Sequence, residues 1–434
     1  AGPAPGDRLR ISLGPSVSAE FERRREGARY VVKRGVIGLN EPAVLPDREG
    51  ISLIGNLPYV DADRWRALLG GVGDAGPSLS SSLRLKVGVL DFAGRRLNDV
   101  DLRAGSSGDV WIANLSAREL AGEIAWRPEG SGRIVARLKH FSMPEAIEGR
   151  KEETPPRELP ALDIIAEKLL LNGSDLGRLE LVAVNKALDW EIEKLVLTGP
   201  ESTLRAGGKW QNWAQQPSVS LDDIVLEVED VGKYLDRVGF PGTVRSGAAT
   251  LKGSLKWSGN PQSIDYASLS GNLELNVEKG QFLKADPGAA KLIGILSMQS
   301  WVTLDFRELF NRGFTFDSVS CNARIENGVL KTDNFRMKGP SAAVAMSGQT
   351  DLARETQDLN ARVEPAVGNS LSVILAVVIN PVWGLGSLLL QEILKNPLAQ
   401  AFAFEYHVTG SWTEPKAERL KLDVQTSDAS QERP

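Results

Sequence analysis

Few residues in this chain have the types and spacing that a reaction centre requires. It has two histidines, His140 and His407, and one cysteine, Cys321, with no HExxH, CxxC or other Cys/His pattern at metal-ligand spacing. In "GSDLG", 173–177, Ser174 directly follows the glycine, which does not match a nucleophile elbow. The sequence therefore predicts a protein that is not an enzyme and uses no cofactor or metal.

Two weaker chemical hypotheses stay open. Asp99 and Asp101 in "NDVDLR" fall on one side of a predicted strand and could hold a cation, although a solvated strand face is the simpler interpretation. Cys321 could be a nucleophile, but with no histidine near it in the sequence a small core residue is favoured. A hydrolase with an unrecognised site is an alternative that a turnover assay would have to support.

Composition limits the class of protein. The 434 residues are 42% hydrophobic and 25% charged, with a net charge of −5, which is typical of a folded chain and excludes general disorder. No basic excess or recognition signature points to nucleic acid. A single cysteine cannot form an internal disulfide, so both the cytoplasm and a bacterial periplasm are compatible. The opening "AGPAPGDRLRIS" has no signal-peptide pattern, so we expect a fragment or processed product, with any anchor upstream.

Strict two-residue alternation is the main structural signal. Stretches such as "LRLKVGVL", "TLKGSLKW", "NLELNVEK" and "FAFEYHVTG" set apolar residues against polar ones, which is typical of half-buried strands. Such stretches recur along the chain between Gly, Asn, Asp and Pro clusters, and we expect roughly twenty strands at the usual spacing. Strands that pair with their sequence neighbours predict a mainly β fold, a long antiparallel meander that grows in one dimension as repeat proteins do.

Helical periodicity is confined to a few stretches. Short helices are predicted over 61–70, 230–240, 286–300 and 304–310, with Gly239 ending the second and Pro287 opening the third. The stretch 371–390 holds no charged residue and is long enough to span a bilayer, but Asn380–Pro381 interrupts it. We expect two apolar helices over 370–395 rather than one spanning helix.

Composition also divides the chain. The clearest linkers are 71–82 and the polar, Pro-rich 143–160. We expect a β-rich segment over 1–142, a linker or loop over 143–160, a β repeat segment over 161–270 and a distinct C-terminal region over 271–434.

Two long stretches resemble a known family. "LPALDIIAEKLLLNGSDLGRLELVA" followed by "GGKW", and the region from "GQFLKADPGAAKLIGILSMQSW" to "MSGQTDL", resemble the AsmA-like proteins of Gram-negative envelopes, of the YhdP type, as does "VTGSW" at 408–412. The residues that carry the C-terminal resemblance are Gly280, Phe282, Pro287, Gly288, Leu304, Asp305, Phe306, Gly313, Phe314, Phe316, Asp317, Gly339, Pro340 and Gly348.

The resemblance implies a fold and a function. Members of this family are thought to be bridge-like lipid carriers, anchored in the inner membrane upstream, whose long twisted, curled sheet forms an apolar groove across the periplasm. It implies phospholipid as the ligand, transported toward the outer membrane, whose inner leaflet is the expected membrane partner, and a periplasmic envelope location. A groove needs no catalytic group. A structural or adaptor protein that binds an outer-membrane partner through its sheet edges is the alternative.

Alternation alone leaves two structural interpretations, a filled sandwich core and an open groove. The scarcity of covering helices, the length and the resemblance favour the groove. Lys252, Lys256 and Glu274, with Glu405, are then expected to point away from it. The residues predicted to line the groove are Leu251, Leu255, Trp257, Leu273, Leu275, Val277, Val344, Met346, Phe402 and Phe404.

The apolar pair over 370–395 is predicted to dip into a membrane leaflet, with helices that plug or line the groove as the alternative. Membrane contact is expected from Val373, Ile374, Leu375, Val377, Val378, Ile379, Trp383, Leu385, Leu388, Leu389 and Leu390.

Overall fold

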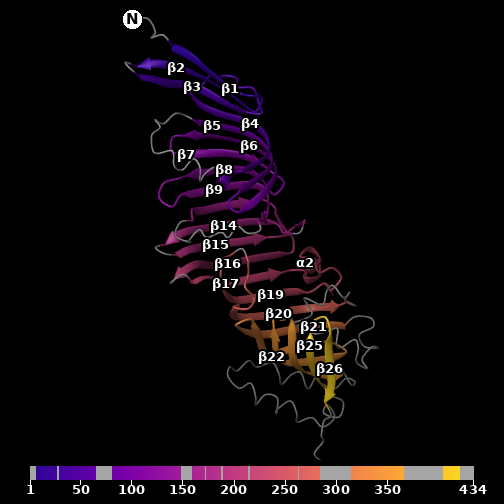
Figure 1. Ribbon diagram of the computed structural model, residues 1–434. Coiled ribbons are helices and arrows are strands. Elements are labelled where there is room, and N and C mark those ends of the chain that lie inside the picture. The colour runs from indigo at the N-terminus through magenta and orange to yellow at the C-terminus, as the bar shows by residue number, and fades with distance from the viewer. Residues whose placement is uncertain are drawn as a thin grey trace, which may run out of the picture. The chain divides into compact units, whose positions relative to one another are not determined.

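The computed structural model describes residues 6–26, 29–64, 81–147, 159–171, 173–186, 189–213, 216–261, 263–283, 314–365 and 404–420. These residues form 26 strands, so the expectation of a mainly β chain is confirmed. The chain divides into two compact units, residues 1–200 with 209–215 and residues 201–208 with 216–434. Strand β16 (Ser202–Trp213) contributes to both. Figure 1 shows strands that follow one another in the sequence lying side by side within each unit.

The sheet of the first unit is built almost entirely from sequence neighbours. Its strands are β1 (Gly6–Leu13), β2 (Val17–Glu26), β3 (Arg29–Leu39), β4 (Gly50–Asp61), β5 (Ser81–Phe92), β6 (Arg95–Ser107), β7 (Val110–Ser116), β8 (Leu120–Arg127), β9 (Arg133–Ser142), β10 (Glu145–Ala146), β11 (Ala161–Ala166), β12 (Leu169–Leu171), β13 (Ser174–Asp175), β14 (Arg178–Lys186) and β15 (Asp189–Thr198). From β1 to β9 each strand pairs with the next, and β11, β14 and β15 continue the order.

The expectation of a purely antiparallel meander is wrong in this unit. The pairs β3–β4, β4–β5, β9–β11 and β9–β12 are parallel, so the sheet is mixed. A parallel neighbour requires a connection long enough to return to the same end of the sheet, which a tight hairpin cannot do. Three long connections precede these parallel strands, over 40–49, 62–80 and 143–160. The last two include most of the two predicted linkers.

The sheet of the second unit is an antiparallel meander. Its elements are β17 (Gln216–Val228), α2 (Val231–Arg237), β18 (Val244–Arg245), β19 (Ala248–Ser258), β20 (Ser270–Phe282), β21 (Phe314–Glu326), β22 (Val329–Lys338), β23 (Ala342–Asp351), β24 (Thr356–Pro365), β25 (Phe404–Ser411) and β26 (Pro415–Leu420). Pairing runs in order from β17 through β19 to β26, and β18 adds a short pairing to β20.

Helix α2 confirms the helix predicted over 230–240. The Asp230 carboxylate accepts a hydrogen bond from the Lys233 amide, which is the usual N-cap arrangement, and lowers its own pKa by doing so. Gly239, with φ +100, follows the helix in the left-handed region that glycine tolerates. Residues 62–64 form a helical turn where the helix over 61–70 was predicted, and the stretches 286–300, 304–310 and 370–395 lie outside the described residues.

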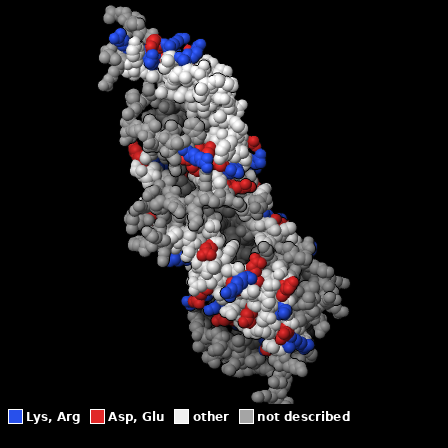
Figure 2. Space-filling model, in the orientation of Figure 1, with Lys and Arg blue, Asp and Glu red and all other residues white. Residues whose placement is uncertain are grey.

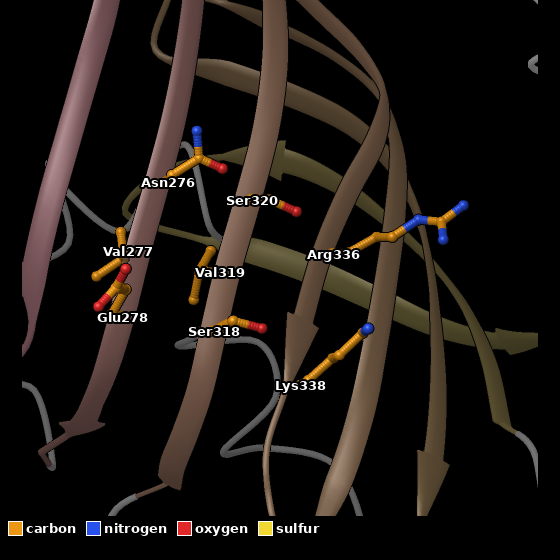
Figure 3. Close-up of a pocket in the computed structure, with 8 residues that line it drawn as sticks. All are labelled: Asn276, Val277, Glu278, Ser318, Val319, Ser320, Arg336 and Lys338. Atoms are coloured by element: carbon orange, nitrogen blue, oxygen red, sulfur yellow. The ribbon is translucent and has the colours of Figure 1, made fainter. Parts of the chain in front are cut away.

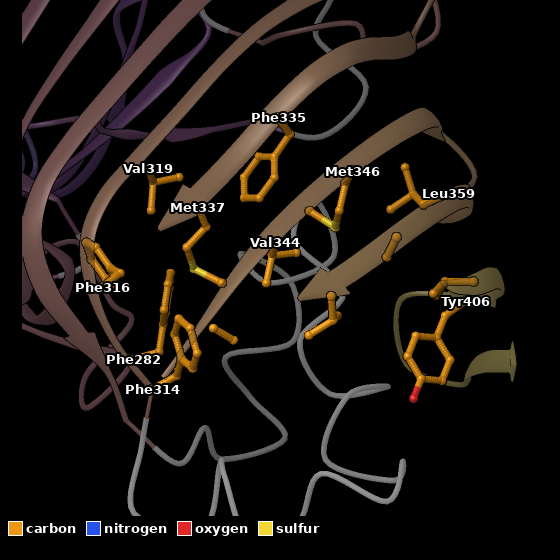
Figure 4. Packing of buried hydrophobic residues seen from close by; sticks show 14 of the residues in the cluster. Phe282, Phe314, Phe316, Val319, Phe335, Met337, Val344, Met346, Leu359 and Tyr406 are labelled. Carbon is orange, nitrogen blue, oxygen red and sulfur yellow. The ribbon is translucent and has the colours of Figure 1, made fainter. Parts of the chain in front are cut away.

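Buried side chains of the second unit gather on one face between β20 and β25. We call this set the C-terminal cluster, and Figure 4 shows its side chains pointing toward one another from the curled strands. Val231 and Leu235 of α2 pack against it. Its members are Val244, Phe282, Phe314, Phe316, Val319, Phe335, Met337, Ala342, Val344, Met346, Leu359, Ala361, Val363, Tyr406 and Val408.

One glycine in this cluster is required by a close approach. The Phe316 ring lies over the backbone of Gly280, its cross-strand partner, and over the Phe282 ring, with a centroid separation of 4.9 Å. A Cβ atom at Gly280 would lie 2.5 Å from Phe316 Cζ. The glycine and the phenylalanine therefore form one packing unit, because the ring covers the space that the glycine leaves.

We predict that Gly280→Ala lowers the free energy of unfolding by about 1–3 kcal/mol, because the added methyl displaces the ring. In a Phe316→Ala background the same substitution should cost almost nothing, since the atom it meets is gone. Denaturant unfolding of the four proteins of this cycle tests the coupling. If the effects of the two substitutions on the free energy of unfolding are additive, the Phe316 ring is not the reason that position 280 requires glycine.

Candidate functional site

The residues that could have done chemistry have structural roles. Asp99 pairs with Arg118 at 2.6 Å and Asp101 with Arg103 at 3.5 Å, so both carboxylates face arginine rather than an open cation site. His407 Nδ1 lies 3.0 Å from the Asn360 side-chain oxygen. Within the described ranges no group of His, Cys, Asp and Glu is arranged to hold a metal ion.

Paired residues in the first unit align in two apolar rows on one sheet face. Directly paired residues point to the same side, so each row can be followed from strand to strand through ten strands, β3 to β9, β11, β14 and β15. One row is Leu39, Gly55, Leu85, Leu102, Leu115, Gly122, Leu138, Ala166, Leu179 and Leu197. The other is Ile37, Leu53, Leu83, Ala104, Ala113, Ile124, Ala136, Ile164, Leu181 and Leu195.

Most side chains of these rows stay partly accessible. Leu85, Leu102 and Leu115 in one row and Ile124 and Leu181 in the other are half-buried rather than enclosed. A filled sandwich core would bury leucine and isoleucine almost completely. Four members of the rows, Ala136, Leu138, Ala166 and Leu179, are buried in a core cluster. The remaining side chains leave a partly accessible apolar surface that can accept further apolar material.

The opposite face of the same strands carries the ion pairs, beside apolar residues such as Ile54, Val135 and Ile165. Arg137 Nη1 lies 2.9 Å from Asp163 Oδ1, and Lys194 Nζ lies 2.6 Å from Glu180 Oε2. The lysine holds the pKa of Glu180 below its usual range. Figure 2 shows lysine and arginine side chains next to aspartate and glutamate side chains on the visible surface. Such exposed pairs contribute little stability, but they keep this face in water.

In the second unit, register puts nine of the ten predicted groove residues on one face. One row runs through eight strands as Val228, Ala249, Val277, Val319, Met337, Val344, Val363 and Phe404. Leu251 pairs with Leu275 in the adjacent row, and Leu255, Trp257, Leu273 and Met346 share the same parity. Phe402 lies outside the described residues. Lys252 and Glu274 pair on the other face, where Glu405 bonds Arg362.

These nine residues differ in how accessible their side chains are to solvent. Leu251, Leu255, Leu273, Leu275 and Val277, on β19 and β20, are half-buried. Val344 and Met346 are only 2% and 5% exposed within the C-terminal cluster. Trp257 is 4% exposed, and its indole N–H donates to the Asn260 carbonyl. The accessible apolar residues of this face therefore lie on β19 and β20, whereas Val219 and Val228 of β17 are buried and most of the face from β21 onward is packed.

A family model described as "YhdP protein" matches residues 1–417. The chain belongs to the YhdP family. A curated relative from Escherichia coli (strain K12), the intermembrane phospholipid transporter YhdP, is 24% identical over 393 residues. That match covers 86% of this chain and 31% of the relative, so the chain spans about a third of the relative's length. No solved structure matches the chain.

The apolar segment of this YhdP-family chain begins and ends at neighbouring strands. Val363 near the end of β24 pairs with Phe404 at the start of β25, so residues 366–403 start and finish at one end of the sheet. Phe282 and Phe314 pair in the same way across residues 284–313, at that same end. The predicted membrane residues, 373–390, lie outside the described residues. Among the helices described, none is long and apolar enough to cross a membrane.

The apolar rows of the first unit were not among the residues predicted from the sequence, although Leu83 and Leu85 belong to one of the alternating stretches noted above. The missing information was register. A strand's alternation says which residues share a face, but only pairing shows that ten such faces align.

The single cysteine lies on the apolar face of the second unit and can serve as a chemical probe of it. Cys321 pairs with Leu275, its thiol lies 3.4 Å from Thr332 Oγ1, and burial raises its pKa. The thiolate is the reactive form, and the raised pKa reduces its fraction at pH 8.

We predict that Cys321 reacts with an uncharged maleimide more slowly at pH 8 than an unfolded control. The rate should rise with pH, because the thiolate fraction grows, and it should stay below that of the unfolded control, because burial raises the pKa of the folded thiol. Mass spectrometry of the quenched reaction follows the modification. A rate equal to that of the unfolded chain would contradict a buried thiol on this face.

Proposed function

We propose that this chain is a non-enzymatic carrier segment for phospholipid, which holds acyl chains against its apolar rows. The observation that supports the proposal is the pair of half-buried apolar rows that continue through ten paired strands of the first unit. Their residues share one face, while the ion pairs lie on the other face. A surface of this kind offers apolar contact along its whole length and contains no group that must react.

Each apolar row is long enough for several lipids in succession rather than for a single ligand. Ten strands at about 4.8 Å spacing extend each row for about 43 Å. One leaflet of a bilayer is about 15 Å of hydrocarbon, so several acyl chains fit along the row. Each CH₂ group kept from water contributes about 0.8 kcal/mol. Because this contribution is nearly equal at every position, a lipid gains no strong preference for one site and can move along the face.

The family and the relative support the same function. The relative's name describes transport of phospholipid between membranes, and we extend that role to this chain. We further propose that it acts in the periplasm of a Gram-negative envelope, downstream of an inner-membrane anchor, and that lipid moves toward the outer membrane. The absence of a recognisable reaction centre in the sequence agrees with a carrier.

We predict that Leu115→Asp lowers the phospholipid bound by the purified chain, and its transfer between vesicles, by about tenfold or more. The carboxylate would meet acyl chains where it cannot be solvated. Asn114→Asp is the matched control, since it adds the same charge one residue away on the exposed opposite face. Leu275→Asp with Asn272→Asp repeats the comparison in the second unit.

Lipid mass spectrometry and a fluorescent transfer assay give the readouts, and thermal unfolding checks that each variant is folded. Equal lipid binding by Leu115→Asp and Asn114→Asp would contradict the carrier proposal. Val344→Asp is unsuitable for this test, because Val344 is packed in the C-terminal cluster and its loss would destabilise the fold.

We also propose that residues 370–395 dock the chain on a membrane leaflet as two apolar helices. The pairing of Val363 with Phe404 supports this, because a strand that returns to its sheet neighbour requires entry and exit on the same side. Burial of such a pair at the acyl boundary would contribute several kcal/mol at about 25 cal/mol per Å².

We predict that replacing residues 368–401 by a short Gly-containing hairpin abolishes flotation with liposomes while β24 and β25 stay paired. Strands already in register need only a turn of about two to five residues. Flotation of the intact and shortened chains, with thermal unfolding as the folding control, measures the effect. Equal flotation would favour helices that line or plug the groove.

An adaptor that pairs its sheet edge with another strand is the second candidate. Leu9, Ile11 and Leu13 of the edge strand β1 are 38%, 48% and 72% exposed, which is unusual for a protected edge. The other edge strand, β26, begins with Pro415 and carries Lys416, Glu418 and Arg419. A folded chain that takes up no phospholipid but captures a peptide strand at β1 would favour this function.

A further inference from the structure

A hollow of about 400 Å³ lies on β20, β21 and β22 in the second unit. Its polar side chains belong to the face opposite the C-terminal cluster. Ser318 pairs with Lys338 and Ser320 pairs with Arg336, while Val319 and Met337 between them point into the cluster. Figure 3 shows the Arg336 and Lys338 side chains extending in the same direction from β22. Asn276 and Glu278 complete the polar lining.

Small residues on the flanking strands create the space. The serines on β21 stand on one side of the two cations, and Ala343 and Ala345 of β23 pair with Lys338 and Arg336 on the other. Cross-strand neighbours lie about 5 Å apart and alternate residues about 7 Å apart. Two hydroxyls and two cations therefore surround an area about the size of one phosphate group.

These donors have no partner among the described residues. No ion pair or hydrogen bond in that part of the chain engages the Arg336 guanidinium, the Lys338 ammonium or either serine hydroxyl. Two carboxylates lie close to the two cations in the sheet. Glu364 accepts a hydrogen bond from Arg362 at 2.8 Å, and Glu278 lines the hollow but lies beyond ion-pairing distance of both cations.

This arrangement differs from the rest of the polar face. Arg324 and Lys331, on the same two strands, both pair with Glu326 at 2.8 and 3.4 Å. Partly buried cations without a carboxylate partner bear a desolvation cost, and an anion would relieve it. Arginine and lysine beside hydroxyl donors are the groups that bind phosphate in proteins.

We propose that this hollow binds a phosphate group, either free in solution or on a lipid headgroup, through Arg336, Lys338, Ser318 and Ser320. The site is separate from the apolar rows and does not depend on the carrier proposal. A headgroup source would hold the polar face of the second unit against an anionic membrane surface, while acyl chains occupy the other face.

The test titrates the full chain with inorganic phosphate and with glycerol 3-phosphate by isothermal calorimetry at low salt. We expect Arg336→Gln/Lys338→Gln to weaken binding about tenfold or more. Arg324→Gln/Lys331→Gln is the matched control, because it removes one arginine and one lysine from the same face, and it should bind as the native chain does. Glu278→Gln should tighten binding by about threefold, since it removes the only negative charge that lines the hollow.

Vesicles of phosphatidylcholine with and without phosphatidylglycerol distinguish the source. Loss of the preference for phosphatidylglycerol vesicles over phosphatidylcholine vesicles in the hollow variant, but not in the control, assigns the phosphate to a headgroup. Binding of free phosphate without that difference assigns it to a soluble ligand. Equal affinities of the two double variants, or no binding of either phosphate by the native chain at millimolar concentration, would overturn the proposal.

Discussion

The structure depends on one constraint, the register between neighbouring strands. Side chains alternate with a period of two, so a slip of one residue would move every leucine of a strand to the charged face. Short turns and the pairing of sequence neighbours fix the register locally, and backbone pairing maintains it where strands run parallel. The aligned rows of Leu85, Leu102 and Leu115 are the direct result. The polar face is aligned by the same constraint, including the cross-strand pairs that form the hollow.

The two units use this alternation differently. In the first unit the rows stay half-buried, which leaves apolar surface in contact with water at a cost of roughly 25 cal/mol per Å². A folded chain that tolerates this cost is suited to an apolar ligand, because the ligand removes it. From β21 onward in the second unit, phenylalanine and methionine side chains fill the concave side of the curled sheet. Close contacts such as Phe316 over Gly280 make this region a packed core.

The packed C-terminal cluster and the accessible apolar surfaces are suited to different roles. Accessible leucines lie on the first unit and on β19 and β20, and these are the surfaces proposed to hold acyl chains. The C-terminal cluster gives a rigid base at the end of the sheet where residues 284–313 and 366–403 begin and end. On the other side of this base, Arg336 and Lys338 face away from the apolar residues.

Local sequence patterns predicted a mainly β chain, helix α2 and, in the clearest stretches, which residues of one strand share a face. Alternation in "TLKGSLKW" and "NLELNVEK" is strict, and the Asp230 cap and Gly239 are local signals that need no distant partner. The resemblance determined the family. Three other features are visible only in the folded structure: the parallel pairing, the burial of individual apolar residues and the polar hollow. Parallel pairing of β3, β4 and β5 depends on long connections whose path has no local code. Val344 is enclosed and Leu275 is accessible because of how the sheet curls. The two residues are similarly hydrophobic and lie on the same face of the sheet, so the sequence pattern does not distinguish them. The hollow beside Arg336 exists because serines and alanines from two other strands come into register with it, and pairing across strands is not contained in any single stretch of sequence.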